Sequence, residues 1–226
     1  MKNRTKFLIS FILNLIIFSF EIIGLILSIR RRGVEVFLFY TEISNYFTLL
    51  ISFIFIIFTI ISINTNKIYP IIYYLRFVSC ICLTITIIVV LFILIPMFPD
   101  TTTFLLFGDS NLYQHLLCPA LSLISFLYFE NHTILPRKMI FCGLMPTITY
   151  GVIMLILNLT KVIVGPYPFF YIYVISPLYS IGGILGIFII SLLTTLSIYF
   201  LYNKKFRKPH ISKFRKRPLN LFWHSP

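Results

Sequence analysis

Charged residues are scarce in this sequence, and acidic residues are the scarcest of them. Only 11% of the 226 residues are charged, and Asp and Glu together number six. A soluble domain averages about 25% charged residues, so this chain has too few to cover a surface that faces water. Because 59% of its residues are hydrophobic, we exclude a soluble globular protein and predict an integral membrane protein.

The few cysteines form neither a disulfide framework nor a metal or redox motif. All four lie inside apolar runs: Cys80, Cys82, Cys118 and Cys142. Their spacing is not that of a zinc knuckle or a redox pair, so we interpret them as small apolar packing residues. A metal site from His115, Glu130 and His132 fails on geometry, because Glu130 is about 22 Å along a helix from His115. The sequence therefore predicts no metal and no other cofactor.

No second domain, internal repeat or cleavable leader is recognisable. The first apolar run, 7–29, exceeds the roughly 7–15 residues of a signal-peptide core, and no small-x-small cleavage site follows it. A membrane span needs about 20 mainly apolar residues. Six stretches meet this criterion: residues 7–29, 36–63, 71–95, 112–130, 139–159 and 174–202. The sequence thus predicts an all-α fold, with one six-helix transmembrane domain over 1–202 and a tail over 203–226.

The distribution of Lys and Arg predicts that both termini are cytoplasmic. Cytoplasmic segments of membrane proteins carry an excess of these residues. With both ends inside, most cations fall on the cytoplasmic side, Arg76 and Lys138 among them, whereas Lys161 and the run 30–32 fall outside. The run 30–32 breaks the rule locally, but the tail decides the balance.

The tail, residues 203–226, is the most basic part of the chain and carries eight Lys and Arg. Straight after a span, such a tail is typical of a segment that lies on anionic lipid headgroups. We exclude nucleic acid as its partner because no recognition fold precedes it. We therefore expect a multi-pass protein of the cell membrane whose partners are membrane lipids. The sequence identifies no protein partner.

The stretch LYQHLLCPA at 112–120 places an imidazole at the mouth of the fourth span. A polar group buried in lipid costs free energy unless it has a partner, and ionisable residues inside a membrane are functional candidates. Pro119 has no N–H, so the carbonyl of His115 loses its helical partner. A functional histidine and an interfacial histidine that touches headgroups or water both fit this position.

The second span opens with a polar stripe. Thr41, Ser44, Asn45 and Thr48 have i, i+3, i+4 and i+7 spacing and share one helical face. Such a face either lines a pocket or holds helices together, since Ser, Thr and Asn hydrogen-bond across membrane helices. With both termini inside, the starts of the second and fourth spans share the outer part of the bilayer.

Two further carboxylates need partners. Glu21 lies near the middle of the first span, where an ionised carboxylate is costly. We expect it to be protonated or paired, and the sequence does not identify the partner. Glu130, followed by Asn131 and His132, is interpreted as an interfacial cluster that ends the fourth span.

Three segments together resemble a known family. They are YTEISN at 40–45, His115 four residues before Pro119, and Tyr167-Pro168-Phe169 before the sixth span. In order, spacing and hydropathy, most of the chain is similar to the androgen-induced-type six-span membrane proteins and their uncharacterised bacterial relatives. In the animal members, a membrane-embedded threonine and a histidine hydrolyse fatty-acid esters of hydroxy fatty acids. The sequence departs from those members around the histidine, so the substrate class stays open.

The resemblance implies that Thr41 is a nucleophile and His115 its base. A threonine hydroxyl is a poor nucleophile until a base takes its proton, and neutral imidazole is the usual base near pH 7. An oxyanion needs hydrogen-bond donors, for which Asn45, one turn from Thr41, is the best candidate. Glu42 is a candidate to orient the imidazole, although it points roughly 100° away from Thr41 on an ideal helix.

The chemistry and the composition leave two hypotheses. In the first, the protein is a lipid-ester hydrolase, with Ser44 and Tyr167 lining the substrate pocket and a lipid entering sideways from the bilayer. In the second, it is a non-enzymatic membrane protein, either a small carrier or a helix-packing partner in a larger complex. The sparse set of polar residues favours the second, although no inverted repeat supports a carrier.

Overall fold

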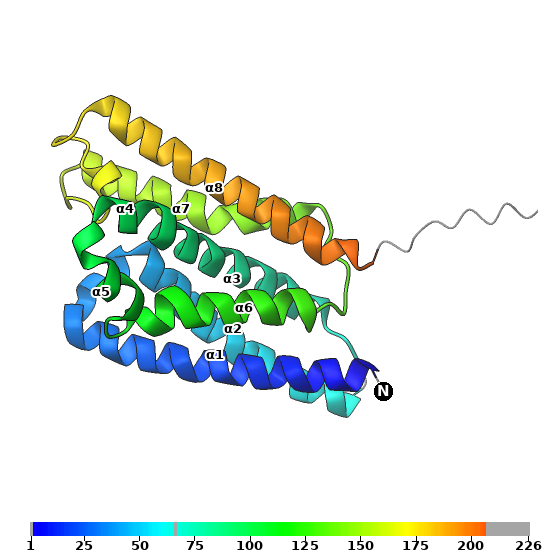
Figure 1. The fold of residues 1–226 in the computed structure, drawn as a ribbon. Helices are drawn as coiled ribbons and strands as arrows, with labels where there is room; N and C mark the ends of the chain where they lie inside the picture. The colour runs from blue at the N-terminus through cyan, green and yellow to red at the C-terminus, as the bar shows by residue number, and fades with distance from the viewer. Residues whose placement is uncertain (1, 66, 207–226) are drawn as a thin grey trace, which may run out of the picture.

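The computed structural model describes residues 2–65 and 67–206, and within these ranges every regular element is helical (Figure 1). The all-α prediction is confirmed. The cations of the predicted basic tail from Arg207 onward lie outside the described residues. The long helices are α1 (Lys2–Arg32), α2 (Tyr40–Thr65), α3 (Pro70–Val89), α6 (Cys118–Tyr128), α7 (Lys138–Leu159) and α8 (Pro177–Lys204).

Short helical pieces connect the long helices. Two of them, η2 and η4, are π-helical and continue directly into α4 and α6. Both lie next to prolines, Pro96 and Pro119, whose missing N–H groups interrupt regular α-helical bonding. The short pieces are η1 (Gly33–Leu38), η2 (Val90–Leu94), α4 (Ile95–Met97), η3 (Pro99–Thr101), α5 (Thr102–Phe107), η4 (Leu112–Leu117) and η5 (Pro168–Phe170).

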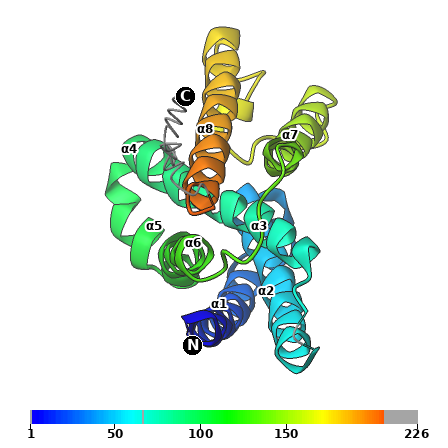
Figure 2. The same ribbon diagram turned by 90° about the vertical axis from the view of Figure 1, so that its right-hand side faces the viewer.

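Helix α3 is the centre of the bundle (Figure 2). On one side it packs with α2 and α6, both of which contact α1, and on the other side with the pair α7 and α8. Its side chains Phe77 and Ile81 are fully buried, and Phe126 of α6 stacks on Tyr202 of α8 with ring centroids 4.7 Å apart. This aromatic and aliphatic core joins the two sides of the bundle.

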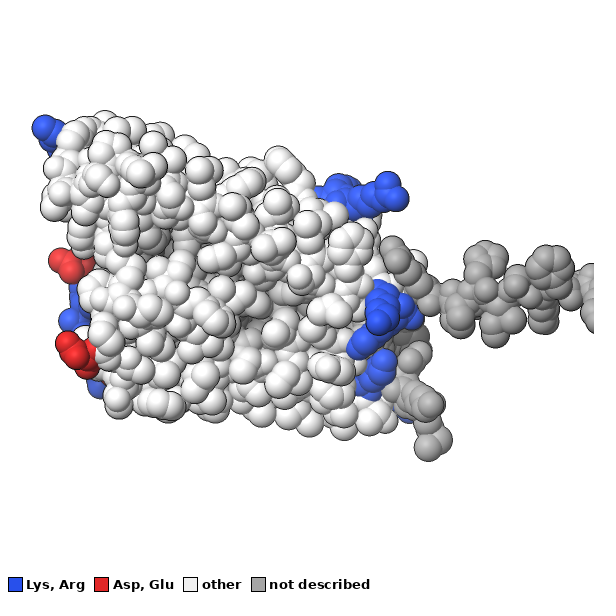
Figure 3. Space-filling view, turned by 45° about the horizontal axis from the view of Figure 1, so that its top comes forward, with Lys and Arg blue, Asp and Glu red and all other residues white. Residues whose placement is uncertain are grey.

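Both ends of the described chain lie at the same end of the bundle, which we call the terminal end (Figure 1). We call the opposite end, which carries α4, α5 and η5, the loop end. In the view of Figure 3, Lys and Arg alone gather at the terminal end, whereas acidic residues also appear at the loop end, and the surface between the ends is uncharged.

Within residues 2–65 and 67–206, five helices are long and apolar enough to cross a bilayer. Large apolar side chains on their outward faces are exposed, including Leu50, Phe92 and Leu193, as expected of a surface in contact with lipid. The five are Arg4–Leu38, Tyr40–Thr65, Pro70–Met97, Lys138–Leu159 and Pro177–Lys204. The apolar helix over the predicted fourth span, Leu112–Tyr128, is shorter, about 25 Å at 1.5 Å per residue.

Candidate functional site

Thr41 lies in the first turn of α2 at the loop end and is almost fully buried. Its backbone N–H, one of the helix-start donors that have no partner within the helix, donates to the Tyr167 hydroxyl at 3.3 Å. The Tyr167 hydroxyl also lies beside the Thr41 side chain. Burial raises the pKa of Tyr167 above its usual range, so at neutral pH this phenol keeps its proton. The Thr41 side chain therefore lies beside a neutral hydroxyl, that of Tyr167, which can donate a hydrogen bond.

A loop fixed by Asn158 brings Tyr167 to Thr41. The Asn158 amide donates to the Gly165 carbonyl and accepts from the Gly165 N–H, both at 2.9 Å. Gly165 has φ +94°, a conformation that side chains rarely adopt. The loop thus turns back over the end of α7 and directs Tyr167 into the bundle.

His115 lies in the π-helix η4, where its ring is 6% exposed. Ring atom Nδ1 is 2.8 Å from the carbonyl oxygen of Leu105 in α5. A carbonyl can only accept, so Nδ1 carries the proton and Nε2 of the neutral ring keeps its lone pair. The ring is therefore held in the tautomer that can take a proton at Nε2.

Asn45 links the helix of Thr41 to the helix of His115. Its Nδ2 donates to the Thr41 carbonyl and, at 3.2 Å, to the Gln114 carbonyl. The starts of α2 and η4 therefore lie at the same level of the bundle. In the described chain, no hydrogen bond joins Thr41 to His115 directly. Because both Asn45 donors are engaged, an oxyanion role for Asn45 would require one of these bonds to open.

The other predicted site residues have different surroundings. Glu42, expected to orient the imidazole, instead accepts from the Tyr46 hydroxyl at 3.0 Å and lies 3.7 Å from Arg31 of α1. The Leu105 carbonyl, and not Glu42, bonds the His115 ring. Ser44, expected to line the substrate pocket, faces α3, where its hydroxyl is 2.7 Å from that of Thr86.

An apolar cavity of about 260 Å³ lies between the start of α2, α3, α7, η5 and α8, and its lining includes Tyr40, the chain neighbour of Thr41. Tyr167 lines it together with Tyr40, Phe170 and Phe188, and its place in a substrate pocket stays a prediction. At its polar end the Tyr40 hydroxyl is 3.0 Å from the hydroxyl of Thr147. The cavity is suited to an apolar chain whose polar group reaches the Thr41–Tyr167 pair.

Comparison of the chain with protein-family models, with curated proteins and with solved structures gives no match. Function has to be inferred from the chemistry of the chain's own residues. Among the described residues, no group of three His, Cys, Asp or Glu side chains could hold a metal ion.

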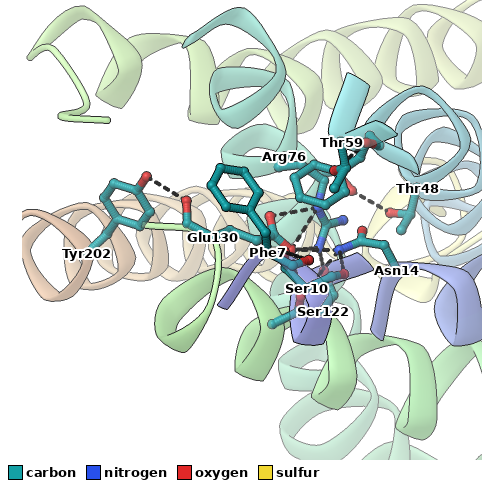
Figure 4. A network of polar contacts seen from close by, with 12 residues as sticks. Phe7, Ser10, Asn14, Thr48, Thr59, Arg76, Ser122, Glu130 and Tyr202 are labelled. Atoms are coloured by element: carbon teal, nitrogen blue, oxygen red, sulfur yellow. Dashed lines mark hydrogen bonds and ion pairs between the residues drawn. The ribbon is translucent and has the colours of Figure 1, made fainter. Parts of the chain in front are cut away.

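The sequence did not predict a second polar centre near the terminal end (Figure 4). Arg76 of α3 and Glu130 are both fully buried and form an ion pair, with Nε 3.0 Å from Oε2 and Nη2 3.0 Å from Oε1. Asn14 of α1 donates to the same carboxylate at 2.9 Å, and the Tyr202 hydroxyl of α8 donates to the Glu130 carbonyl at 3.1 Å. Through its carboxylate and its backbone carbonyl, Glu130 thus links α1, α3 and α8.

The positions of Arg76 and Glu130 in the sequence contained a signal for this pair. We had interpreted Arg76 as a charge facing the cytoplasm and Glu130 as part of an interfacial cluster. Both lie toward the terminal ends of neighbouring antiparallel helices and carry opposite charges, which is the arrangement that allows pairing inside a membrane. A hydropathy profile scores Arg76 and Glu130 separately, each as one charged residue in an apolar run. It therefore does not predict that the two form a pair.

Proposed function

We propose that the protein is an intramembrane lipid-ester hydrolase in which Thr41 is the nucleophile and His115 the general base. The observation that carries this proposal is the hydrogen bond from His115 Nδ1 to the Leu105 carbonyl. It leaves Nε2 as a proton acceptor in a buried, neutral ring, which is the form that activates a hydroxyl. The Asn45 link to the Gln114 carbonyl supports a common location for the two side chains.

The cavity beside Thr41 supports an apolar substrate. Its lining is mainly aromatic and aliphatic and includes Tyr167, whose hydroxyl accepts from the Thr41 backbone N–H. An ester whose acyl chain fills this cavity would present its carbonyl to Thr41. A protonated tyrosine beside the nucleophile is suited to stabilising an oxyanion, so we assign this role to Tyr167 in preference to Asn45.

The reaction would take place in two steps. In the first, Thr41 Oγ attacks the ester carbonyl while His115 Nε2 takes its proton; the alkoxide leaves with that proton as the alcohol, and an acyl-threonine remains. In the second, His115 takes a proton from water, the hydroxide attacks the acyl-threonine, and the fatty acid departs as Thr41 recovers its proton. A direct bond between threonine and histidine can form as substrate binds, since such contacts are often long without it.

The test is labelling by a fluorophosphonate probe and turnover of a panel of lipid esters by the purified protein. We expect Thr41→Ala and His115→Ala to abolish both, and Thr41→Ser to keep both. Thr59→Ala is the matched control, because Thr59 is a buried threonine of the same helix that bonds only the Phe55 carbonyl. Unchanged labelling and turnover in Thr41→Ala and His115→Ala proteins of wild-type stability would exclude this function.

In the membrane, we propose six spans in the cell membrane with both termini cytoplasmic and the basic tail on anionic headgroups. The shared location of the two ends of the described chain and the excess of cations at the terminal end support this orientation (Figures 1 and 3). The fourth span would be the shorter helix Leu112–Tyr128, which lies at the lower limit of about 17 residues. The hydrolytic site then faces the outer leaflet.

A further inference from the structure

Near the start of η4, a group of buried polar side chains, which we call the polar layer, has atoms without hydrogen-bond partners among the described residues. Its central member is Glu21 of α1, which is fully buried and whose carboxylate has only the weakly donating thiol of Cys118 beside it. The neighbouring thiol of Cys118 is directed to the Ile17 carbonyl at 3.9 Å. Buried polar atoms are nearly always paired with protein, water or an ion, so this carboxyl calls for a ligand.

Two amide side chains add oxygens to this layer. Gln114 of η4 lies against the bare backbone of Gly24, one turn from Glu21; a β-carbon at Gly24 would be 2.9 Å from its Cγ. Gln114 is 1% exposed, and neither atom of its amide has a partner. Asn45 of α2, whose nitrogen donates to the Gln114 carbonyl, has an unpartnered Oδ1. Unsatisfied polar atoms thus lie on α1, α2 and η4, three segments that contact one another.

No protein cation neutralises Glu21 in the described chain. Arg31 pairs with Glu42 and Asp109, each at 3.7 Å, and Arg76 pairs with Glu130. The titratable groups that face Glu21 are Glu42 of α2 and Cys118 of α6, and neither supplies a positive charge. An ionised carboxylate in this position is costly without a counter-charge. The missing charge has to come from a bound cation.

We propose that Glu21, with Gln114 and Asn45, forms an intramembrane site for one exchangeable monovalent cation, either a proton or Na⁺. Carboxylate and amide oxygens are hard ligands suited to both. The site adjoins the π-helix η4, and irregular helices beside a buried carboxylate are a recurrent setting for coupling ions near the middle of a membrane. This site does not depend on the proposed hydrolysis.

The test is labelling of the purified protein by a lipid-soluble carbodiimide, which reacts with protonated carboxyls in apolar surroundings, followed by peptide mass spectrometry. We expect Glu21 to be labelled and the labelling to fall several-fold as pH rises. Protection by NaCl but not by choline chloride would assign the site to Na⁺, and pH dependence without salt protection would assign it to a proton. Either outcome supports the proposal.

Glu35→Gln is the matched control, because Glu35 is an exposed carboxylate at the loop end, and it is expected to leave the labelling unchanged. Glu21→Gln is expected to remove the label. Since peptide mapping locates the label on the wild-type protein, the result does not depend on how well the Glu21 variant folds. Absence of label on Glu21, or labelling that ignores both pH and salt, would overturn the proposal.

Discussion

At the scale of single residues, buried charge is the main determinant of this structure. Arg76 and Glu130 have no exposure to solvent, and each bonds the other and serine or asparagine side chains around them, with only Nη1 of Arg76 left without a partner among the described residues. Such a pair stabilises little in comparison with apolar residues of the same shape, but loss of one partner leaves a buried charge alone.

We therefore expect Arg76→Met to lower the free energy of unfolding by about 3–5 kcal/mol. Arg76→Met combined with Glu130→Met should recover most of that loss, because no unpaired charge remains. Arg137→Met, an exposed arginine at the same end, should change stability by less than about 0.5 kcal/mol. Unfolding by SDS in mixed micelles measures all three. A double variant no more stable than Arg76→Met would contradict this account.

At the scale of elements, the positions of the long helices could be predicted and their irregularities could not. Uninterrupted Ile, Leu and Phe predict helix wherever the chain is in lipid, and helices occupy all six predicted ranges. The π-helices η2 and η4 depend on which neighbours satisfy the freed backbone groups, for example Asn45 at the Gln114 carbonyl. These partners are set by the tertiary structure and cannot be read from the sequence. The same holds for the two hydrogen bonds that the Asn45 amide donates, which a helical wheel does not show.

The contact between α1 and η4 depends on the absence of a side chain at Gly24. A β-carbon there would lie 2.9 Å from Gln114 Cγ, so Gly24→Ala requires the buried Gln114 side chain or η4 to shift and should cost about 1–3 kcal/mol of stability. Gly182→Ala in α8 is the control, because no atom lies within 4 Å of its added β-carbon; it should be neutral or slightly stabilising. Thermal unfolding of both proteins in detergent compares them. Equal melting temperatures for Gly24→Ala and wild type would show that this close approach is not required.

At the scale of the whole molecule, composition and charge distribution predicted the class of protein but not the location of its polar chemistry. Scarcity of charge indicated a membrane bundle because few polar groups are left to face water. Thr41 and His115 could be chosen from the sequence by position and resemblance. The contact of the Tyr167 hydroxyl with the Thr41 backbone depends on the loop that Asn158 folds back, and no spacing rule contains it.

Orientation in the bilayer can be tested with one pair of introduced cysteines. Asp100 and Lys138 are both exposed and lie at the loop end and the terminal end respectively. In intact cells, a membrane-impermeant maleimide should label Asp100→Cys at once and Lys138→Cys only after permeabilisation. The native cysteines are buried or half-buried, and the unsubstituted protein gives the background. The reverse labelling pattern would place the candidate hydrolytic site on the cytoplasmic side.

The hydrogen bond between the His115 ring and the Leu105 carbonyl links a buried imidazole to a short helix at the surface of the protein. Leu105 belongs to a six-residue helix whose Phe104 and Phe107 side chains are largely exposed. An antibody fragment or a lipid that binds this short helix and moves it outward would break the bond to Nδ1. The ring proton would then be free to move from Nδ1 to Nε2. With the proton on Nε2, His115 would no longer accept a proton there, so a molecule bound at the surface would inactivate the proposed base without contacting it.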